Sequence, residues 1–152
     1  MSRSISSPPG RFARSSKLAR YLAAAYLALV LYASLYPFSG WRTPLGDLSA
    51  FLSGDWPYYV TVSDVVLNGL AYLPLGLLLT LVLMGHMHRG PATLLGVVAG
   101  TLLSFVIEVA QGYLPARIPS NLDLLTNSAG TLVGAALAYG FGSRWLLSGD
   151  LY

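Results

Sequence analysis

The chain has 152 residues, of which 55% are hydrophobic and only 10% are charged, whereas soluble domains carry about 25% charged residues. It contains no cysteine, which excludes disulfides, thiol catalysis and cysteine-based metal sites. A net charge of +3 would suggest nucleic acid as the partner of a soluble protein. Here the orientation of a membrane protein explains it better, so we expect no nucleic-acid binding.

Four stretches lack Asp, Glu, Lys and Arg, namely residues 21–41, 65–88, 90–107 and 124–143. At 1.5 Å per residue, each is long enough, or nearly so, to cross a hydrocarbon core of about 30 Å. We therefore predict an all-α membrane protein, a bundle of four transmembrane helices over residues 18–36, 62–84, 92–114 and 122–141. Because these spans use nearly the whole length, we expect one membrane domain, residues 17–145.

The remaining segments differ from the spans in composition. Residues 1–16 are rich in Ser, Pro and Arg, which is typical of a disordered basic tail, and residues 146–152 form a short C-terminal tail. The first span follows a basic segment, as in a signal peptide, but its apolar run is too long and no A-x-A-like cleavage site follows it. We interpret it as a retained helix. The connection over residues 42–63 predicts a short amphipathic piece on the outer membrane surface.

The charges at the ends of the spans predict the orientation of the chain. Five basic residues precede or begin the first span: Arg3, Arg11, Arg14, Lys17 and Arg20. Because Lys and Arg beside a span favour the cytoplasm, the N-terminus is predicted inside. Arg89 and Arg144 then also lie inside. The outer side receives Asp47, Asp55, Asp64, Arg117 and Asp123. The sequence thus predicts both termini in the cytoplasm.

Three of the predicted spans carry an acid and an amide about one helical turn apart at the outer end. The pairs are Asp64 and Asn68, Glu108 and Gln111, and Asp123 and Asn127. A spacing of three or four residues places each pair on one helix face. An ionisable group such as Glu108 is costly inside a membrane and is a functional-site hypothesis by default. With Arg117 in the loop between two of these spans, we predict a shared polar recess in the outer leaflet.

Small residues on the same faces indicate that these faces point into the bundle. The third span repeats small residues every four positions at Ala92, Gly96, Gly100 and Ser104, and the fourth at Gly130, Gly134 and Ala138. Small residues at this spacing let helix backbones approach closely. The second span carries a matching ladder at Asp64, Asn68, Tyr72, Gly76 and Thr80.

Five sequence elements carry a family resemblance: Asn68-x-x-x-Tyr72-x-Pro74-x-Gly76, Glu108-x-x-Gln111, Arg117, Asp123-x-x-x-Asn127 and Gly130-x-x-x-Gly134. In this order and spacing, over roughly residues 30–142, the sequence resembles the VanZ-like family of small integral membrane proteins. The named member of that family is associated with low-level resistance to glycopeptide antibiotics, chiefly teicoplanin. The resemblance implies a bacterial cell-envelope protein of the cytoplasmic membrane with an outer-leaflet site, and it supplies no reaction.

The candidate residues also have structural interpretations. A buried Glu108 bonded to Arg117 or to an amide would fix helix register. Arg117 would anchor at the headgroups instead of clamping a phosphate, and Asp123 would cap its helix. These alternatives stay open at the level of sequence.

Metal binding has weak support in the sequence. The acids Asp64, Glu108 and Asp123 would suit a divalent cation through their oxygens. His86 and His88 lie in a predicted cytoplasmic turn without a third ligand. We expect neither a metal nor a cofactor.

The favoured function is recognition without catalysis. The pocket would bind an anionic amphiphile, such as a lipid-linked glycan, a teichoic-acid-like polymer or a lipoglycopeptide, and so affect glycopeptide susceptibility. The predicted binding residues are Asp64, Asn68, Tyr72, Glu108, Gln111, Arg117, Asp123 and Asn127. Two alternatives stay open: a transferase or hydrolase acting on an envelope lipid with Glu108 as general base, and a small homo-oligomeric transporter built around Glu108.

Overall fold

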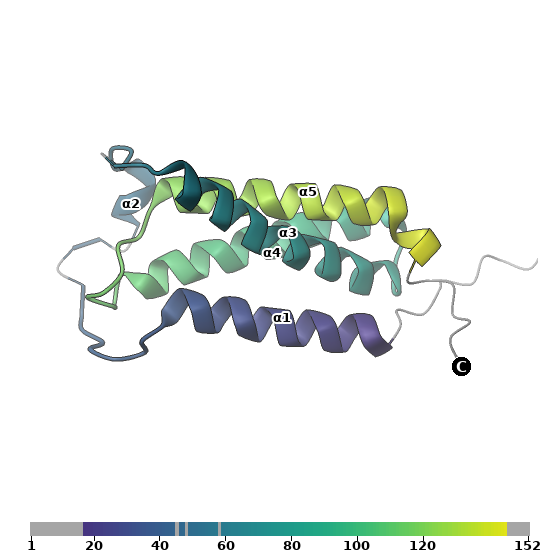
Figure 1. Cartoon of the computed structure of the whole chain (residues 1–152), viewed down its shortest axis with the longest axis horizontal. Helices are drawn as coiled ribbons and strands as arrows, with labels where there is room; N and C mark the ends of the chain where they lie inside the picture. The colour runs from purple at the N-terminus through teal and green to yellow at the C-terminus, as the bar shows by residue number, and fades with distance from the viewer. Residues whose placement is uncertain (1–16, 45, 48, 58, 146–152) are drawn as a thin grey trace, which may run out of the picture.

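The computed structural model describes residues 17–44, 46–47, 49–57 and 59–145. Within these ranges all regular structure is helical, and the helices are α1 (Lys17–Leu35), α2 (Ala50–Ser53), α3 (Val62–Met84), α4 (Arg89–Gln111) and α5 (Asn121–Trp145). The four long helices run side by side in an elongated bundle, and α2 lies at one end (Figure 1). The all-α prediction is confirmed. The predicted tails, residues 1–16 and 146–152, lie outside the described residues.

Three helices, α1, α3 and α4, are long and apolar enough to cross a membrane by their length and composition. The fourth long helix, α5, has 25 residues but is the least hydrophobic of the four on average. Its polar side chains are largely turned inward. The hydroxyls of Ser128 and Thr131 donate to the carbonyl oxygens of Leu124 and Asn127, at 2.7 and 2.9 Å. Such bonds lower the cost of polar groups in an apolar environment.

The helix ends lie within one residue of the predicted spans, except in α4 and at the end of α5. Helix α5 ends at Trp145 rather than at residue 141. Helix α4 begins at Arg89 rather than at residue 92 and ends at Gln111 rather than at residue 114. Pro91 does not prevent the earlier start. It lies in the first helical turn, where a backbone N–H has no acceptor within the helix. At the other end, the N–H of Gly112 bonds to the carbonyl oxygens of Glu108 and Val109, and the chain leaves the helix as a turn.

The backbones of α3 and α5 touch along their small residues. A Cβ atom at Gly130 would overlap the carbonyl oxygen of Gly69, and one at Gly134 would overlap that of Leu73. A Cβ at Gly100 of α4 would likewise overlap the side chain of Thr131. The small-residue faces therefore point into the bundle as predicted, because only residues with little or no side chain permit this approach.

Helix α1 packs on the outside of α3 and α4. Val30 joins an apolar cluster with Tyr72, Leu75 and Ile107, and the hydroxyl of Tyr26 donates to the carbonyl oxygen of Ala71 at 2.9 Å. Most of the remaining surface of α1 is exposed. The position of α1 therefore depends on a narrow seam and on the contacts at its C-terminal end.

The connection between α1 and α3 contains one helical turn, α2, which lies near the start of α5. Before it, Asp47 accepts hydrogen bonds from the backbone N–H and the hydroxyl of Ser49, both at 2.9 Å. These two bonds lower the pKa of the Asp47 carboxyl below its usual value. That the segment lies on the membrane surface stays a prediction.

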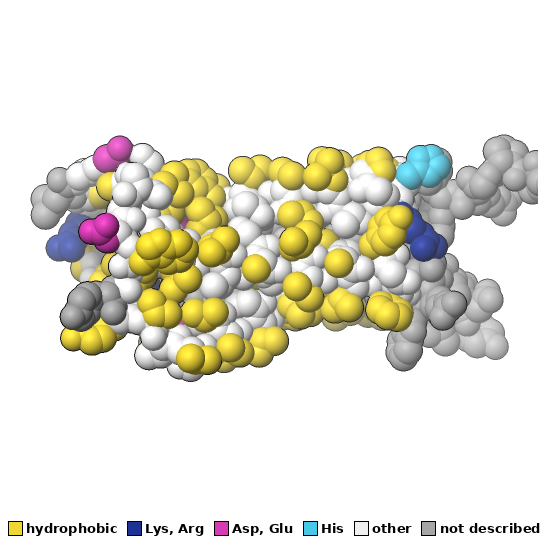
Figure 2. Space-filling view, turned by 90° about the horizontal axis from the view of Figure 1, so that it is seen from above, with side chains coloured by type: hydrophobic (Ala, Val, Ile, Leu, Met, Phe, Trp, Pro, Cys, Tyr) yellow, Lys and Arg dark blue, Asp and Glu magenta, His cyan; other side chains and the backbone are white. Residues whose placement is uncertain are grey.

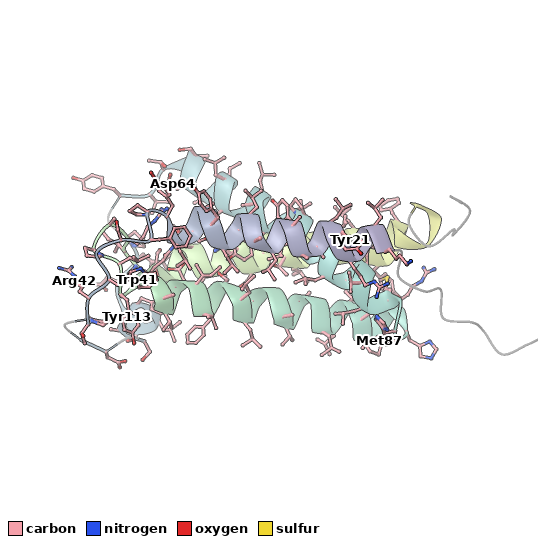
Figure 3. All side chains as sticks on the ribbon, turned by 90° about the horizontal axis from the view of Figure 1, so that it is seen from below. Tyr21, Trp41, Arg42, Asp64, Met87 and Tyr113 are labelled. Carbon is pink, nitrogen blue, oxygen red and sulfur yellow. The ribbon has the colours of Figure 1, made fainter. Side chains whose placement is uncertain are left out.

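The acidic side chains gather at one end of the bundle, where Arg42 and Arg117 also lie. Every Asp and Glu of the described residues lies toward the end where α3 and α5 begin and α4 finishes, which we call the acidic end. The opposite, basic end carries Lys17, Arg20 and Arg89. Figure 2 shows magenta acidic side chains toward the acidic end, dark blue basic ones at both ends, and yellow apolar side chains between the ends. In Figure 3, Trp41, Arg42, Asp64 and Tyr113 mark the acidic end, and Tyr21 and Met87 the basic end.

Candidate functional site

Glu108 lies near the end of α4 and is 2% exposed. Its Oε2 atom accepts a hydrogen bond from the backbone N–H of Ser120 at 2.8 Å. The hydroxyl of Ser120 in turn accepts the N–H of Asp123 at 3.3 Å, which caps the start of α5. Glu108 therefore ties the loop between α4 and α5 to α4. Of the two predicted structural partners, an amide holds Glu108, and Arg117 does not.

Of the other two acids of the predicted recess, Asp123 lies close to Glu108, and Asp64 lies close to Asp123. Asp123, in the first turn of α5, lies near the side chain of Asn68 in α3. Its carboxylate interacts electrostatically with those of Asp64 and Glu108. Within the described part of the chain, however, no group of three acids or histidines is arranged to hold a metal ion. The divalent-cation hypothesis therefore gains no support.

A second polar layer lies farther into the bundle. The Nδ2 atom of Asn127 donates to the hydroxyl of Ser104 at 3.0 Å. The Tyr72 hydroxyl lies near the same hydroxyl but outside the limits of hydrogen-bond geometry. All three residues are buried, and neither the Tyr72 hydroxyl nor the Oδ1 atom of Asn127 has a hydrogen-bond partner. The layer joins α3, α4 and α5 through polar contacts.

Gln111 and Arg117 are directed toward α1 instead of toward the acids. The Nε2 atom of Gln111 donates to the carbonyl oxygen of Ser34 at 3.0 Å. The guanidinium of Arg117 donates to the carbonyl oxygens of Ala33, at 2.8 Å from Nη2, and of Tyr36, at 3.2 Å from Nε. Of the eight predicted residues, these two therefore donate hydrogen bonds to α1. The other six lie on α3, α4 and α5, where Asp64 is exposed at the acidic end.

The contacts of these two residues complete the C-terminus of α1. The last four carbonyl groups of a helix have no partner within it. In α1, Tyr36 and Phe38 donate their backbone N–H groups to the carbonyl oxygens of Tyr32 and Leu35. The two carbonyls between these receive the side chains of Arg117 and Gln111. All four terminal carbonyls are thus satisfied, which matters most where water is scarce.

An open pocket of about 440 Å³ lies near the buried Glu108, between the segment that follows α2, the start of α3 and the loop before α5. Asp55, Asp64 and Asp123 line it, together with the aromatic side chains of Phe51 and Tyr59. Among the described residues that line it there is no Lys or Arg. We call this hollow the acidic pocket. Glu108 does not line it, because it is buried behind Ser120.

Sequence reasoning missed several residues of this region. It assigns Asp55 to the outer side but to no site, and it treats Ser120 only as part of a loop. Ser120 and Asp123 form an S-x-x-D pattern, a signal for a helix start that identifies Ser120 as a cap. Asn121 links the loop to α2, since its Nδ2 atom donates to the carbonyl oxygen of Gly54 at 3.0 Å. No local pattern predicts that long-range contact.

Apolar helices long enough to cross a membrane, packed around a polar cluster at one end, define an integral membrane protein. The model of the VanZ/LLP1 family matches residues 11–144, so the chain belongs to the VanZ/LLP1 family. The resemblance seen in the sequence is thereby confirmed. No curated protein and no solved structure was found to match the chain.

Proposed function

We propose that α5 crosses the membrane together with α1, α3 and α4. It runs the length of the bundle beside α3 (Figure 1), and its backbone touches that of α3 at two glycines. Short connections join α3, α4 and α5. With basic residues on the cytoplasmic side, the basic end faces the cytoplasm and the acidic end faces outward from a bacterial cytoplasmic membrane. Both termini are then cytoplasmic.

We further propose that the acidic pocket recognises the polar head of an envelope amphiphile. The observation that carries this proposal is the set of carboxylates of Asp55, Asp64 and Asp123 around one open pocket without a basic side chain. Ionised carboxylates only accept hydrogen bonds, so such a wall suits a head rich in donors. The hydroxyls of a glycan are such donors, and Phe51 and Tyr59 add the apolar surface that ligand pockets commonly provide.

Among the predicted ligands, the geometry favours a lipid-linked glycan held through its sugar. An anionic group would need donors, and Arg117 does not line the pocket. Two of the five N–H donors of its guanidinium already serve carbonyls of α1. A teichoic-acid-like polymer or a lipoglycopeptide would be recognised through its hydroxyl or amine groups in the same way. By binding such a molecule the protein would alter glycopeptide susceptibility.

The two alternative functions gain less support. A general base must reach the proton that it removes, but Glu108 is 2% exposed and lies outside the pocket. A transporter needs a path to the cytoplasmic side. In the half of the bundle toward the basic end, Gly96 packs so closely on Thr80 that a Cβ would overlap its hydroxyl, and Gly76 packs as closely on the backbone of Thr131. These contacts favour a closed core.

Binding of two single-chain probes tests the proposal. Dodecyl maltoside carries a sugar head, and dodecyl phosphate carries an anionic head on the same chain. In nanodiscs of phosphatidylethanolamine and phosphatidylglycerol, we expect saturable binding of the maltoside and weaker binding of the phosphate. Asp64→Asn and Asp123→Asn should each weaken maltoside binding about tenfold, because a hydrogen bond to a charged group contributes about 1.5–3 kcal/mol.

Asp47→Asn is the matched control. It removes the same charge at the same end, lies outside the acidic pocket, and retains an oxygen that can accept the Ser49 bonds. Its maltoside affinity should equal that of the wild type. Tighter binding of the phosphate, or unchanged affinity in both pocket variants, would contradict the proposal. Thermal unfolding of each variant separates loss of binding from loss of fold.

A further inference from the structure

A second hollow lies next to the acidic pocket. It has a volume of about 530 Å³ and is lined by residues of α4, of α5 and of the segment around α2. Leu52, Trp56, Leu124 and Leu125 give it a mainly apolar wall. Leu52, Trp56 and Leu125 are 49%, 60% and 53% exposed, so nothing within the described chain covers that wall. We call this hollow the apolar groove.

The two hollows meet at one contact. Both are lined by Gly54 and Asn121, whose hydrogen bond, from Nδ2 of Asn121 to the carbonyl oxygen of Gly54, is 3.0 Å long. The Oδ1 atom of Asn121 is buried and has no hydrogen-bond partner. On the side of the acidic pocket, three carboxylates lie among apolar residues such as Val60 and Ile118. On the other side, the described residues that line the groove carry no charge and are mainly apolar. A half with charged groups and a half without them suit the head and the chain of an amphiphile.

We propose that the acidic pocket and the apolar groove form one binding site for a single amphiphile. The hydroxyl-bearing head lies in the pocket and the hydrocarbon chain of the same molecule lies in the groove, across the contact between Asn121 and Gly54. The inference rests on the function proposed for the acidic pocket. The groove is assigned to a hydrocarbon chain because it is continuous with that pocket. It also reaches Ser128, which is about 10 Å along α5 from Asn121 and so within the depth of the outer leaflet.

The groove would help the protein select a glycoside that carries a hydrocarbon chain. It would add little binding free energy through burial of that chain. A chain that leaves the bilayer for the groove exchanges one apolar environment for another, so it gains little from burial. Its position there, however, holds the attached head over the acidic pocket and raises the effective concentration of the head. A glycoside with a chain should therefore bind more tightly than the same sugar without one, and filling the groove should reduce that difference.

Photo-crosslinking with a dodecyl maltoside that carries a diazirine in its alkyl chain tests the inference on the full chain in nanodiscs. We expect label on the peptide that contains residues 124–128 and on the segment around α2. Ser128→Phe places a ring in the groove and should lower this labelling about tenfold, which corresponds to about 1.4 kcal/mol of binding free energy. It should lower the affinity for dodecyl maltoside without changing that for maltose.

The matched control is Ala129→Phe, which adds a ring of the same size at an exposed neighbour that does not line the groove. It should label as the wild type does. Thr101→Phe fills the groove from α4 and replaces Ser128→Phe if that variant does not fold. The inference would be overturned if the label on residues 124–128 were as strong with a filled groove as in the wild type. Equal dodecyl maltoside affinity in the two would overturn it as well.

The outcomes for the two proposals are distinguishable. Suppose that Asp64→Asn weakens maltoside binding and Ser128→Phe does not. The function proposed for the acidic pocket is then supported, and the apolar groove does not hold the chain. If neither change matters, both proposals fail. If the groove instead binds a second copy of the protein, Leu125→Cys should form a disulfide-linked dimer and the diazirine should not label residues 124–128, which overturns the inference.

Discussion

The side chain of Gln111 donates a hydrogen bond to the carbonyl oxygen of Ser34 at 3.0 Å, across 77 positions in sequence. This bond and the two from Arg117 complete the end of α1 and attach it to the rest of the bundle. Residues that form part of a family pattern therefore have a structural role in this chain. Their substitution is expected to change how α1 docks before it changes any ligand contact.

Gln111→Leu should loosen α1. Leucine keeps most of the side-chain volume but leaves the Ser34 carbonyl without a partner, at a cost of about 1–3 kcal/mol. The free energy of unfolding in mild detergent measures the loss. A cysteine pair introduced across α1 and α4, in a chain without native cysteines, reports whether the helices still meet. Arg42→Gln serves as the control at the same end of the bundle. Arg42 donates a hydrogen bond through its backbone N–H, which the substitution keeps, so this change should have little effect on stability. Equal stability of Gln111→Leu and the wild type would contradict this role.

The stability of the fold should depend on Glu108 as a hydrogen-bond acceptor more than on its negative charge. Glu108→Gln keeps an oxygen for the Ser120 N–H, whereas Glu108→Leu leaves that donor without its partner, at about 1–3 kcal/mol. We therefore expect Glu108→Gln to be the more stable variant. Hydrogen exchange at the Ser120 amide should accelerate strongly in Glu108→Leu alone. If Glu108→Gln lost as much protection as Glu108→Leu, the ionised carboxylate itself would be essential.

Gly134→Ala should separate α3 from α5, because its Cβ would overlap the carbonyl oxygen of Leu73. Overpacking of this kind costs about 1–3 kcal/mol. Gly140→Ala is the matched control on the same helix, since nothing lies within 4 Å of the added Cβ, and alanine favours a helix over glycine by about 1 kcal/mol. Thermal unfolding should place Gly134→Ala below the wild type and Gly140→Ala at or above it. The reverse order would exclude close backbone packing at Gly134.

Single cysteines should report the proposed orientation. In intact cells, a membrane-impermeant maleimide should label Ser53→Cys at the acidic end but not His88→Cys at the basic end. In inverted membrane vesicles the pattern should reverse, because the positive-inside rule places the basic end in the cytoplasm. Labelling of both positions from the same side would disprove that the two ends of the bundle lie on opposite sides of the membrane. Labelling of His88→Cys alone in intact cells would invert the orientation.

Several properties of the protein followed from the sequence by itself. Stretches without charge predicted long apolar helices, and small residues every four positions predicted which faces of α4 and α5 turn inward. Spacings of three or four residues placed the acids and amides on those faces. These features are local: helix periodicity converts sequence spacing directly into position along and around a helix.

The tertiary structure decided which polar residues meet. Sequence spacing gave Gln111 and Arg117 the same side of the membrane as Glu108 and Asp123, but it does not give the order of helices around the bundle. Only the docking of α1 beside α4 brought its unpaired carbonyls to Gln111 and Arg117. Likewise, the acidic pocket and the apolar groove are both lined by Asn121 and Gly54, whose hydrogen bond joins segments 67 positions apart. Such contacts join segments far apart in the chain, so the need to satisfy buried backbone groups selects them only once the helices have packed.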